Sequence, residues 1–195
     1  PMNPCSRKGE IRARVSERLF EAHRSGKVIA TAGRASDFYG PGGTQTGLGD
    51  FFWPRALSRK TAYSPFSLDA IHTYHYIRDV ASGLALLGCA DSSVYGRPWM
   101  LPCAPAETLR QLVARLQTKL GFNIKVAQVP RWLVKAAGLV TPLMRELDEM
   151  AYQWDEPFVI DDRRFRERFD VVPENIDVTA AATVAWARQH YPRSA

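Results

Sequence analysis

The sequence predicts an α/β protein in which short strands alternate with helices, and three segments favour this fold class. Residues 28–32 form a short apolar run with β-branched side chains next to glycine, which is typical of a buried strand. Residues 72–77 alternate and are rich in Tyr and Thr, as in a second strand. Residues 107–120 carry apolar side chains at helical spacing. Polar residues follow the first strand, at the strand end where open α/β sheets bind ligands.

A helix is expected before the first strand. Ser6 is a candidate N-cap, and Ile11, Val15 and Leu19 recur every four residues on one face. Gly26 follows at the position where many helices end with a left-handed residue. A helix, a strand and a long loop in this order form half of a βαβ unit.

Helices and strands continue to alternate through the middle of the chain. We expect a short helix near Pro54, a strand over 98–101 and another over 124–129. Asp79 is placed to cap a helix that runs to Leu87. The helix over 107–120 ends at a glycine, and its apolar stripe consists of Leu109, Leu112, Val113, Leu116 and Leu120.

The last third of the chain is predicted to be mostly helical. Pro130 and Pro142 are placed as first-turn prolines of two helices. Asp161 or Asp162 is expected to cap a third helix, and Asp177 to cap the terminal one. The predicted buried face of the terminal helix carries Ala181, Val184 and Trp186.

Composition and charge exclude several classes of protein. The 195 residues are 46% hydrophobic and 24% charged, as in an ordinary globular protein, and are enough for one domain or a part of a larger one. No apolar run approaches the ~20 residues of a membrane span, and no signal peptide is expected. The net charge of +6 comes from basic residues interleaved with acidic ones, which disfavours nucleic-acid binding. Three widely spaced cysteines suggest neither a metal site nor a disulfide, so we expect a cytoplasmic protein.

Four segments match known motifs in the same order. Residues 34–41 are close to R-P-x-N-x-Y-G-P, with Asp37 where that pattern has Asn. Residues 72–81 are close to R-D-F-x-Y-V-D-D-V-A, and residues 99–120 and 149–161 follow with a matching strand, helix and C-terminal pattern. Over almost its whole length the chain thus resembles the extended short-chain dehydrogenase/reductase superfamily, the group of nucleotide-sugar epimerases and dehydratases.

The resemblance implies a partial Rossmann-like parallel sheet, the C-terminal half of an NAD(P)-binding domain, with a small, mostly helical substrate-binding domain. Residues 1–50 and 68–104 would form the first unit, and residues 51–67 and 105–195 the second. The glycine fingerprint that holds the dinucleotide in this family would precede the first helix. The glycines within 40–49 do not match it and are better interpreted as a flexible loop. We therefore expect the chain to be the C-terminal portion of a longer protein.

The resemblance also places a catalytic Tyr-x-x-x-Lys pair at the start of the first helix. Lys8 stands at the Lys position, where it would hydrogen-bond the nicotinamide ribose. Pro4 stands at the Tyr position and has no acid–base group, and Cys5 is one residue out of register. Such a loss is typical of the atypical branch of the superfamily. Lys8 is equally well interpreted as a solvated first-turn lysine.

The segment after the first strand holds the other candidate cofactor and catalytic residues. Arg34, Ala35 and Ser36 match positions that border the cofactor in the family, the last two mostly through backbone groups. Asp37 matches a substrate-contacting position, and its carboxylate could accept a hydroxyl proton or act as a base. The alternative is an Asx-type turn residue that bonds its own backbone.

Further substrate contacts are expected from Tyr39 and from the strand over 72–77. His72 and Tyr74 share one face of that strand, with His75 on the opposite face. His72 replaces the Arg of the family pattern and could hydrogen-bond a polar substrate. The alternative is a packed histidine with its hydrogen bonds satisfied inside the fold.

These observations predict an NAD(P)-dependent epimerase, dehydratase or reductase whose dinucleotide is bound mainly by a missing N-terminal half. The expected partner is a small molecule, a sugar or another hydroxy or keto compound, with no metal and no membrane. A homodimer is also considered. Whether the protein is an enzyme stays open because of Pro4. The alternative is a non-catalytic NAD(P)-binding sensor or interaction protein on the same fold, since fold does not fix function.

Overall fold

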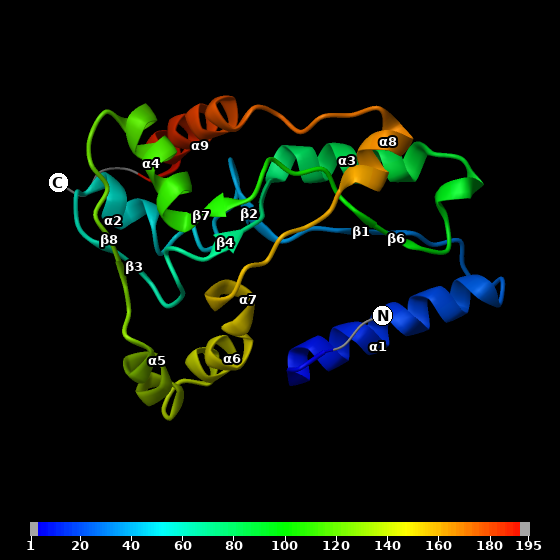
Figure 1. Cartoon of the computed structure of the whole chain (residues 1–195), viewed down its shortest axis with the longest axis horizontal. Coiled ribbons are helices and arrows are strands. Elements are labelled where there is room, and N and C mark those ends of the chain that lie inside the picture. The colour runs from blue at the N-terminus through cyan, green and yellow to red at the C-terminus, as the bar shows by residue number, and fades with distance from the viewer. Residues whose placement is uncertain (1–3, 192–195) are drawn as a thin grey trace.

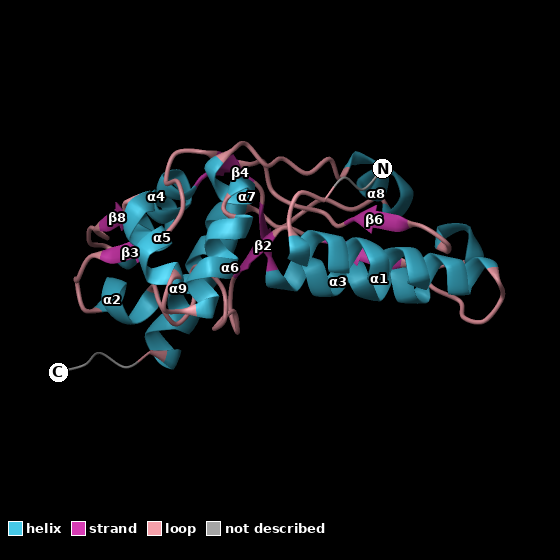
Figure 2. Cartoon of the chain, turned by 90° about the horizontal axis from the view of Figure 1, so that it is seen from below, coloured by secondary structure: helices cyan, strands magenta, loops and turns pink. Residues whose placement is uncertain are grey.

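A computed structural model describes residues 4–191 of the chain (Figure 1). The helices are α1 Arg7–Arg24, α2 Trp53–Leu57, α3 Ile77–Cys89, α4 Leu109–Leu120, α5 Arg131–Gly138, α6 Pro142–Met150, α7 Tyr152–Asp155, α8 Arg163–Phe169 and α9 Ile176–His190. The strands are β1 Ala32–Arg34, β2 Asp37–Tyr39, β3 Ala62–Ser64, β4 Ile71–His72, β5 Tyr74–Tyr76, β6 Pro98–Met100, β7 Glu107–Thr108 and β8 Val126–Gln128. Helices alternate with short strands, which confirms the predicted α/β class (Figure 2).

The strands pair two by two. β1 pairs with β6, β2 with β5 and β3 with β8, each in parallel, while β4 and β7 run antiparallel. β1 and β2 follow each other almost directly, yet they have different partners. The chain therefore changes its partner strand at Ala35 and Ser36, the two residues between them.

His75 fills the junction between these strand pairs. Its Nδ1 accepts the backbone N–H of Ser36 at 3.1 Å, and its Nε2 lies 3.2 Å from the carbonyl oxygen of Leu101. The two partners require a neutral ring with its proton on Nε2, which donates to Leu101. The backbone N–H of Leu101 in turn donates to the carbonyl of Arg34 at 2.9 Å. A single buried imidazole thus joins β2, β5 and the end of β6.

Two apolar cores lie on either side of this junction. The first gathers side chains of α2, α4 and α9, among them Trp53, Leu112, Leu116, Val184 and Ala187. The second lies between α3, β6 and α8 and contains Leu87, Val94, Trp99, Leu101 and Phe165. Figure 1 shows α2, α4 and α9 toward one end of the molecule and α3 and α8 toward the other, with α5, α6 and α7 at its lower margin.

Several capping residues and glycines correctly predicted where helices begin or end. The Ser6 side chain accepts the N–H of Gly9 at 3.1 Å, and Gly26 has the expected positive φ of 73° just after α1. Gly121 ends α4 with a φ of 77°, and Asp161 accepts the N–H of Arg163 at the start of α8. Each of these signals acts within one helical turn, so it does not depend on distant packing.

The strand predicted over 28–32 was placed too early. β1 begins at Ala32, and Val28 and Ile29 are exposed rather than buried. A run of β-branched residues becomes a buried strand only when helices cover both faces of its sheet. α1 precedes this run but buries none of its own residues, so it does not supply that cover.

The caps predicted at Asp79 and Asp177 were wrong. β5 runs directly into α3, so Tyr76 occupies the N-cap position and Asp79 lies inside the first turn. At α9 the side chain of Asn175 accepts the N–H of Asp177 at 2.9 Å. Acidic residues favour both the cap and the first turn of a helix, and the preceding strand or turn selects between them.

The buried face of α9 differs from the predicted one. Ala181 is exposed, whereas Thr179, Ala180, Thr183, Val184 and Ala187 are buried. Two of the buried residues are threonines, which an apolar periodicity cannot identify. The Thr183 hydroxyl instead donates to the carbonyl of Thr179 one turn earlier, at 2.6 Å.

Replacement of His75 should destabilise the fold. We expect His75→Leu to lower the free energy of unfolding by about 2–5 kcal/mol, because two buried backbone groups lose their partner. Chemical denaturation followed by circular dichroism measures this change. The exposed His190→Leu should change it by less than about 0.5 kcal/mol. Equal effects of the two variants would contradict the role given to His75.

The His75 ring should also make stability depend on pH. Burial lowers its pKa in the folded chain, so below about pH 6.5 the unfolded chain binds a proton that the folded chain does not. Stability is therefore lost as the pH falls below that value, by up to about 1.4 kcal/mol per pH unit. Unfolding curves between pH 5 and 7 should show a smaller slope for His75→Leu than for the unchanged chain.

Candidate functional site

The candidate site lies at the point where the chain changes its partner strand. Ser36 precedes β2, and Asp37 is the first residue of β2, directly opposite Tyr74 of β5. In open α/β sheets, ligands bind outside the strand ends at points where the topology changes. The local sequence places polar side chains at this point.

The carboxylate of Asp37 receives two N–H donors on one oxygen. His72 Nε2 lies 2.9 Å from Oδ2, and the indole N–H of Trp154 donates to the same oxygen. The Asp37 side chain nevertheless remains 40% exposed. One edge of the carboxylate is therefore held by the protein while the group stays open to solvent.

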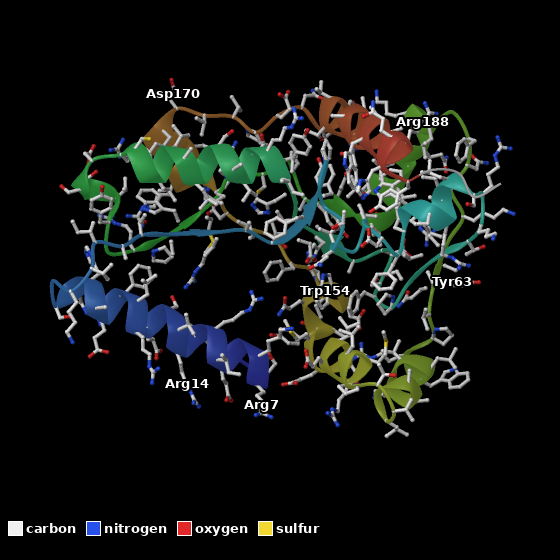
Figure 3. The ribbon with its side chains drawn as sticks, turned by 180° about the vertical axis from the view of Figure 1, so that it is seen from behind. Arg7, Arg14, Tyr63, Trp154, Asp170 and Arg188 are labelled. Atoms are coloured by element: carbon white, nitrogen blue, oxygen red, sulfur yellow. The ribbon has the colours of Figure 1, made fainter. Side chains whose placement is uncertain are left out.

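Trp154 comes from α7, far along the chain from Asp37. Its ring stacks on Phe66, with 4.0 Å between centroids and 18° between planes. The next residue, Asp155, accepts the backbone N–H of Ser67 at 3.0 Å and pairs with Arg131. These contacts fix α7 against the loop before β4, and Figure 3 shows Trp154 in the middle of the molecule.

His72 is buried in an aromatic environment. Its ring lies 5.0 Å from that of Tyr74 and 5.4 Å from that of Phe158, on which it stacks. Its Nε2 also lies 3.0 Å from the Ser36 hydroxyl. Burial and the nearby Asp37 carboxylate raise the pKa of the Tyr74 phenol, so that Tyr74 stays a neutral donor.

Ser36, His72 and Asp37 do not form a hydrolytic triad. Such a triad needs the serine and the acid on opposite ring nitrogens of the histidine. Here both side chains approach the same nitrogen, Nε2. The arrangement can orient and hold a carboxylate acceptor, but it does not prepare Ser36 as a nucleophile.

Lys8 lies in α1, and Arg34, the last residue of β1, contacts α1. Lys8 Nζ lies 3.5 Å from Glu146 of α6, and both side chains are half exposed. Within residues 4–191, no hydrogen bond or ion pair joins Lys8 to Asp37. Arg34 donates to the hydroxyl of Ser16 in α1 at 2.9 Å. The cofactor contacts predicted for both residues stay predictions.

Ala35 and Tyr39 pack against the two cores. Ala35 is partly buried beside the second core. Tyr39 is 1% exposed, and its hydroxyl lies 2.6 Å from that of Thr179. Burial raises the pKa of Tyr39 to about 12. This placement gives Tyr39 a structural role, and the substrate contact predicted for it stays a prediction.

Several members of the cluster, or their contacts, were not predicted from the sequence. Trp154 was not among the predicted site residues, and Ser36 was expected to act mostly through its backbone. Phe158, on which His72 stacks, was not considered for the site. Trp154 lies within the matching pattern at 149–161, but nothing in its spacing shows that its indole reaches β2.

Several solved structures share this fold. A dTDP-glucose 4,6-dehydratase from Bacillus anthracis, solved with NAD, matches 97% of this chain and 54% of its own length, with a TM-score of 0.72 at 15% identity. A UDP-glucuronic acid 4-epimerase from Bacillus cereus, solved with UDP-glucuronic acid and NAD, matches 97% and 55%, with a TM-score of 0.74 at 13% identity. A UDP-glucose 4-epimerase from Thermus thermophilus matches 95% and 55%, with a TM-score of 0.70 at 18% identity.

These matches confirm the fold that the motifs implied. The chain spans about half the length of the structures it matches. At these identities the likeness establishes the fold alone. Neither protein-family models nor curated proteins give a match. None of the helices in residues 4–191 is both long and apolar enough to cross a lipid bilayer.

The link between Asp37 and Trp154 should be measurable as a coupling energy. Trp154→Phe keeps a ring to stack on Phe66 but removes the indole N–H, so we expect it to lower stability by about 1–3 kcal/mol. Combined with Asp37→Asn, it should give a coupling of at least about 0.5 kcal/mol in a double-mutant cycle. Trp186→Phe is the matched control, because that indole lies on α9, outside the cluster. Additive effects of Trp154→Phe and Asp37→Asn would contradict the link.

Proposed function

We propose that this chain is the substrate-facing half of an NAD(P)-dependent epimerase, dehydratase or reductase that acts on a nucleotide sugar or a related hydroxy or keto compound. A further segment of the same protein would hold most of the dinucleotide. Residues 1–50 and 68–104 would complete that cofactor domain, while residues 51–67 and 105–195 would close over the substrate.

One observation carries this proposal: nearly the whole chain matches one half of enzymes that bind NAD and nucleotide sugars. The match to the epimerase solved with UDP-glucuronic acid and NAD reaches a TM-score of 0.74 over 97% of the chain. A further neighbour, RMD from Pseudomonas aeruginosa, was solved with NADPH. We extend the cofactor and the substrate class of these neighbours to this chain as a proposal.

Exposed apolar side chains support the existence of a covering half. Ile11 and Val15 of α1 are 53% and 62% exposed, and Ile29 just before β1 is 74% exposed. Figure 1 shows α1 at the margin of the molecule. Large apolar side chains on consecutive elements favour a surface that packs against another part of a protein.

The residues at the start of β2 fit one end of a dinucleotide and its substrate. Ala35 and Ser36 stand at the carboxyl end of β1, where such sheets bind ligands. Bound NAD(P) would accept and return a hydride there. Lys8 and Arg34 would lie on the cofactor side, and Asp37, His72 and Tyr74 on the substrate side. The exposed Asp37 carboxylate would accept a hydrogen bond from a substrate hydroxyl and hold its proton.

A second candidate function is non-catalytic NAD(P) binding. Pro4 stands where the family carries its catalytic Tyr, and the nearby Lys8 is paired with Glu146. A protein with this arrangement could bind the dinucleotide and a ligand without turnover. The predicted homodimer stays a prediction in either case.

Ligand binding and turnover of the protein from the whole reading frame test the proposal. We expect NADH or NADPH to bind in a fluorescence titration, and one of a set of UDP- and dTDP-sugars to be converted. Asp37→Asn should lower kcat/KM by about 10²-fold, because it removes the negative acceptor of the substrate proton. The dinucleotide affinity should not change.

Asp69→Asn is the matched control, since Asp69 is an exposed acid whose carboxylate pairs with Arg110 of α4. It should leave kcat/KM unchanged. Dinucleotide binding without turnover of any sugar would favour the non-catalytic function. Micromolar binding of a dinucleotide to residues 1–195 alone would contradict the proposal that another half holds it.

A further inference from the structure

Two neighbouring strands each carry a buried polar atom without a partner. Within residues 4–191, neither His72 Nδ1 nor Glu107 Oε1 has a hydrogen-bond partner. The His72 side chain is 3% exposed and that of Glu107 is 9% exposed. An unsatisfied polar atom in such a place costs about 1–3 kcal/mol. Two of them close together therefore need an explanation.

The two residues face each other directly. β4 and β7 pair in antiparallel register, with His72 opposite Glu107. Side chains at directly opposed positions project to the same face, with Cβ atoms about 4.5–5.5 Å apart. Glu107 and the His72 imidazole therefore lie on the same face of the β4–β7 pair.

The opposite end of each side chain is already engaged. His72 Nε2 faces Asp37 Oδ2 at 2.9 Å, and Glu107 Oε2 accepts from Arg115 Nε at 2.9 Å. Arg115 also pairs with Asp177 of α9 at 3.4 Å. His72 Nδ1 and Glu107 Oε1 are thus the side-chain atoms of these two residues that remain without a partner within residues 4–191.

We propose that Glu107 is the positioning residue of the candidate site: Glu107 Oε1 and His72 Nδ1 share one proton, so that a continuous hydrogen-bonded chain runs from Asp37 to Arg115. The functional meaning of this chain rests on the proposed role of Asp37, whereas the pairing itself does not.

The protons balance in both forms of the pair. The shared proton exchanges between Glu107 Oε1, where His72 is neutral, and His72 Nδ1, where the ring is an imidazolium beside the carboxylates of Glu107 and Asp37. In both forms His72 keeps its N–H on Nε2 and donates it to Asp37. Without Glu107, the ring can take the other tautomer, which would turn a nitrogen lone pair toward the carboxylate and weaken its hold on Asp37.

The groups around the pair agree with a shared proton. Burial raises the pKa of Glu107, and the Arg115 guanidinium opposes this rise. Asp37 and the Ser36 hydroxyl face His72 from β2 and the residue before it, and Tyr74 approaches from β5. Arg115 and Asp177 face Glu107 from α4 and α9. The Arg115 guanidinium and the His72 imidazole thus lie among three carboxylates, those of Asp37, Glu107 and Asp177.

Nitrogen NMR of the histidine side chains tests the pairing without any substrate. The chain has four histidines, and the His72 signals are assigned by their loss in His72→Gln. We expect a protonated Nε2 and an Nδ1 signal between those of a bare and a protonated nitrogen. In Glu107→Leu, His72 should show a mixture of tautomers, while the signals of His75 report that the chain is folded.

Two further variants provide a second test of the pairing and a control. In Glu107→Gln the amide can donate to Nδ1 and still accept from Arg115, so Nδ1 should become a bare acceptor with Nε2 protonated. Asp177→Asn removes the other partner of Arg115 and should leave the His72 signals unchanged. His72 signals that are identical in the unchanged chain and in Glu107→Gln would overturn the pairing, even if Glu107→Leu does not fold.

A functional measurement then separates the pairing from the proposed reaction. In the whole protein, Glu107→Leu should raise KM for the sugar about 10-fold through a misplaced Asp37, and Glu107→Gln should restore it. Altered His72 signals without any sugar turnover would support the pairing and contradict the proposed reaction. Unaltered His72 signals would contradict the pairing, whatever the turnover.

Discussion

The hydrogen bonds of His75 hold together the part of the fold on which the site depends. The backbone pairs with β6 along β1 and, only two residues later, with β5 along β2. This change of partner strand interrupts the regular ladder of backbone hydrogen bonds. His75 accepts from Ser36 on one side and donates to Leu101 on the other, so both orphaned backbone groups are satisfied. Because both roles belong to one neutral tautomer, the ring orientation is unambiguous. The hydrogen bond from Ser36 to this imidazole therefore fixes the positions of Ser36 and of the adjacent Asp37.

Asp37 links this junction to the helical region. The carboxylate receives N–H groups from β4 and from α7, and α7 is itself tied to the loop before β4 through Asp155. Movement of α7 would therefore alter the donors on Asp37. These donors connect the proposed substrate role of Asp37 to the position of α7.

Much of the fold could be predicted from the sequence, but the site could be predicted only in part. Local signals correctly predicted the start of α1 at Ser6, the apolar stripe of α4 and its end at Gly121. They did not predict the exposure of Val28 and Ile29, because burial depends on what covers a strand. Asp37 and His72 were recognised as candidates from their motifs. The Trp154 indole and Glu107 were not, since each reaches the cluster through pairing with a distant segment.

The sequence by itself determined the α/β class, the helices with clear apolar periodicity, and the polar segment that follows the first strand. These features depend on interactions within one or two helical turns, between residues that are close together in the sequence. The tertiary structure decided which nitrogen of His72 faces Asp37, that Trp154 donates to a carboxylate 117 residues away, and that Glu107 lies opposite His72. Hydrogen bonds between distant residues are selected by packing and strand register, and no local pattern carries that information.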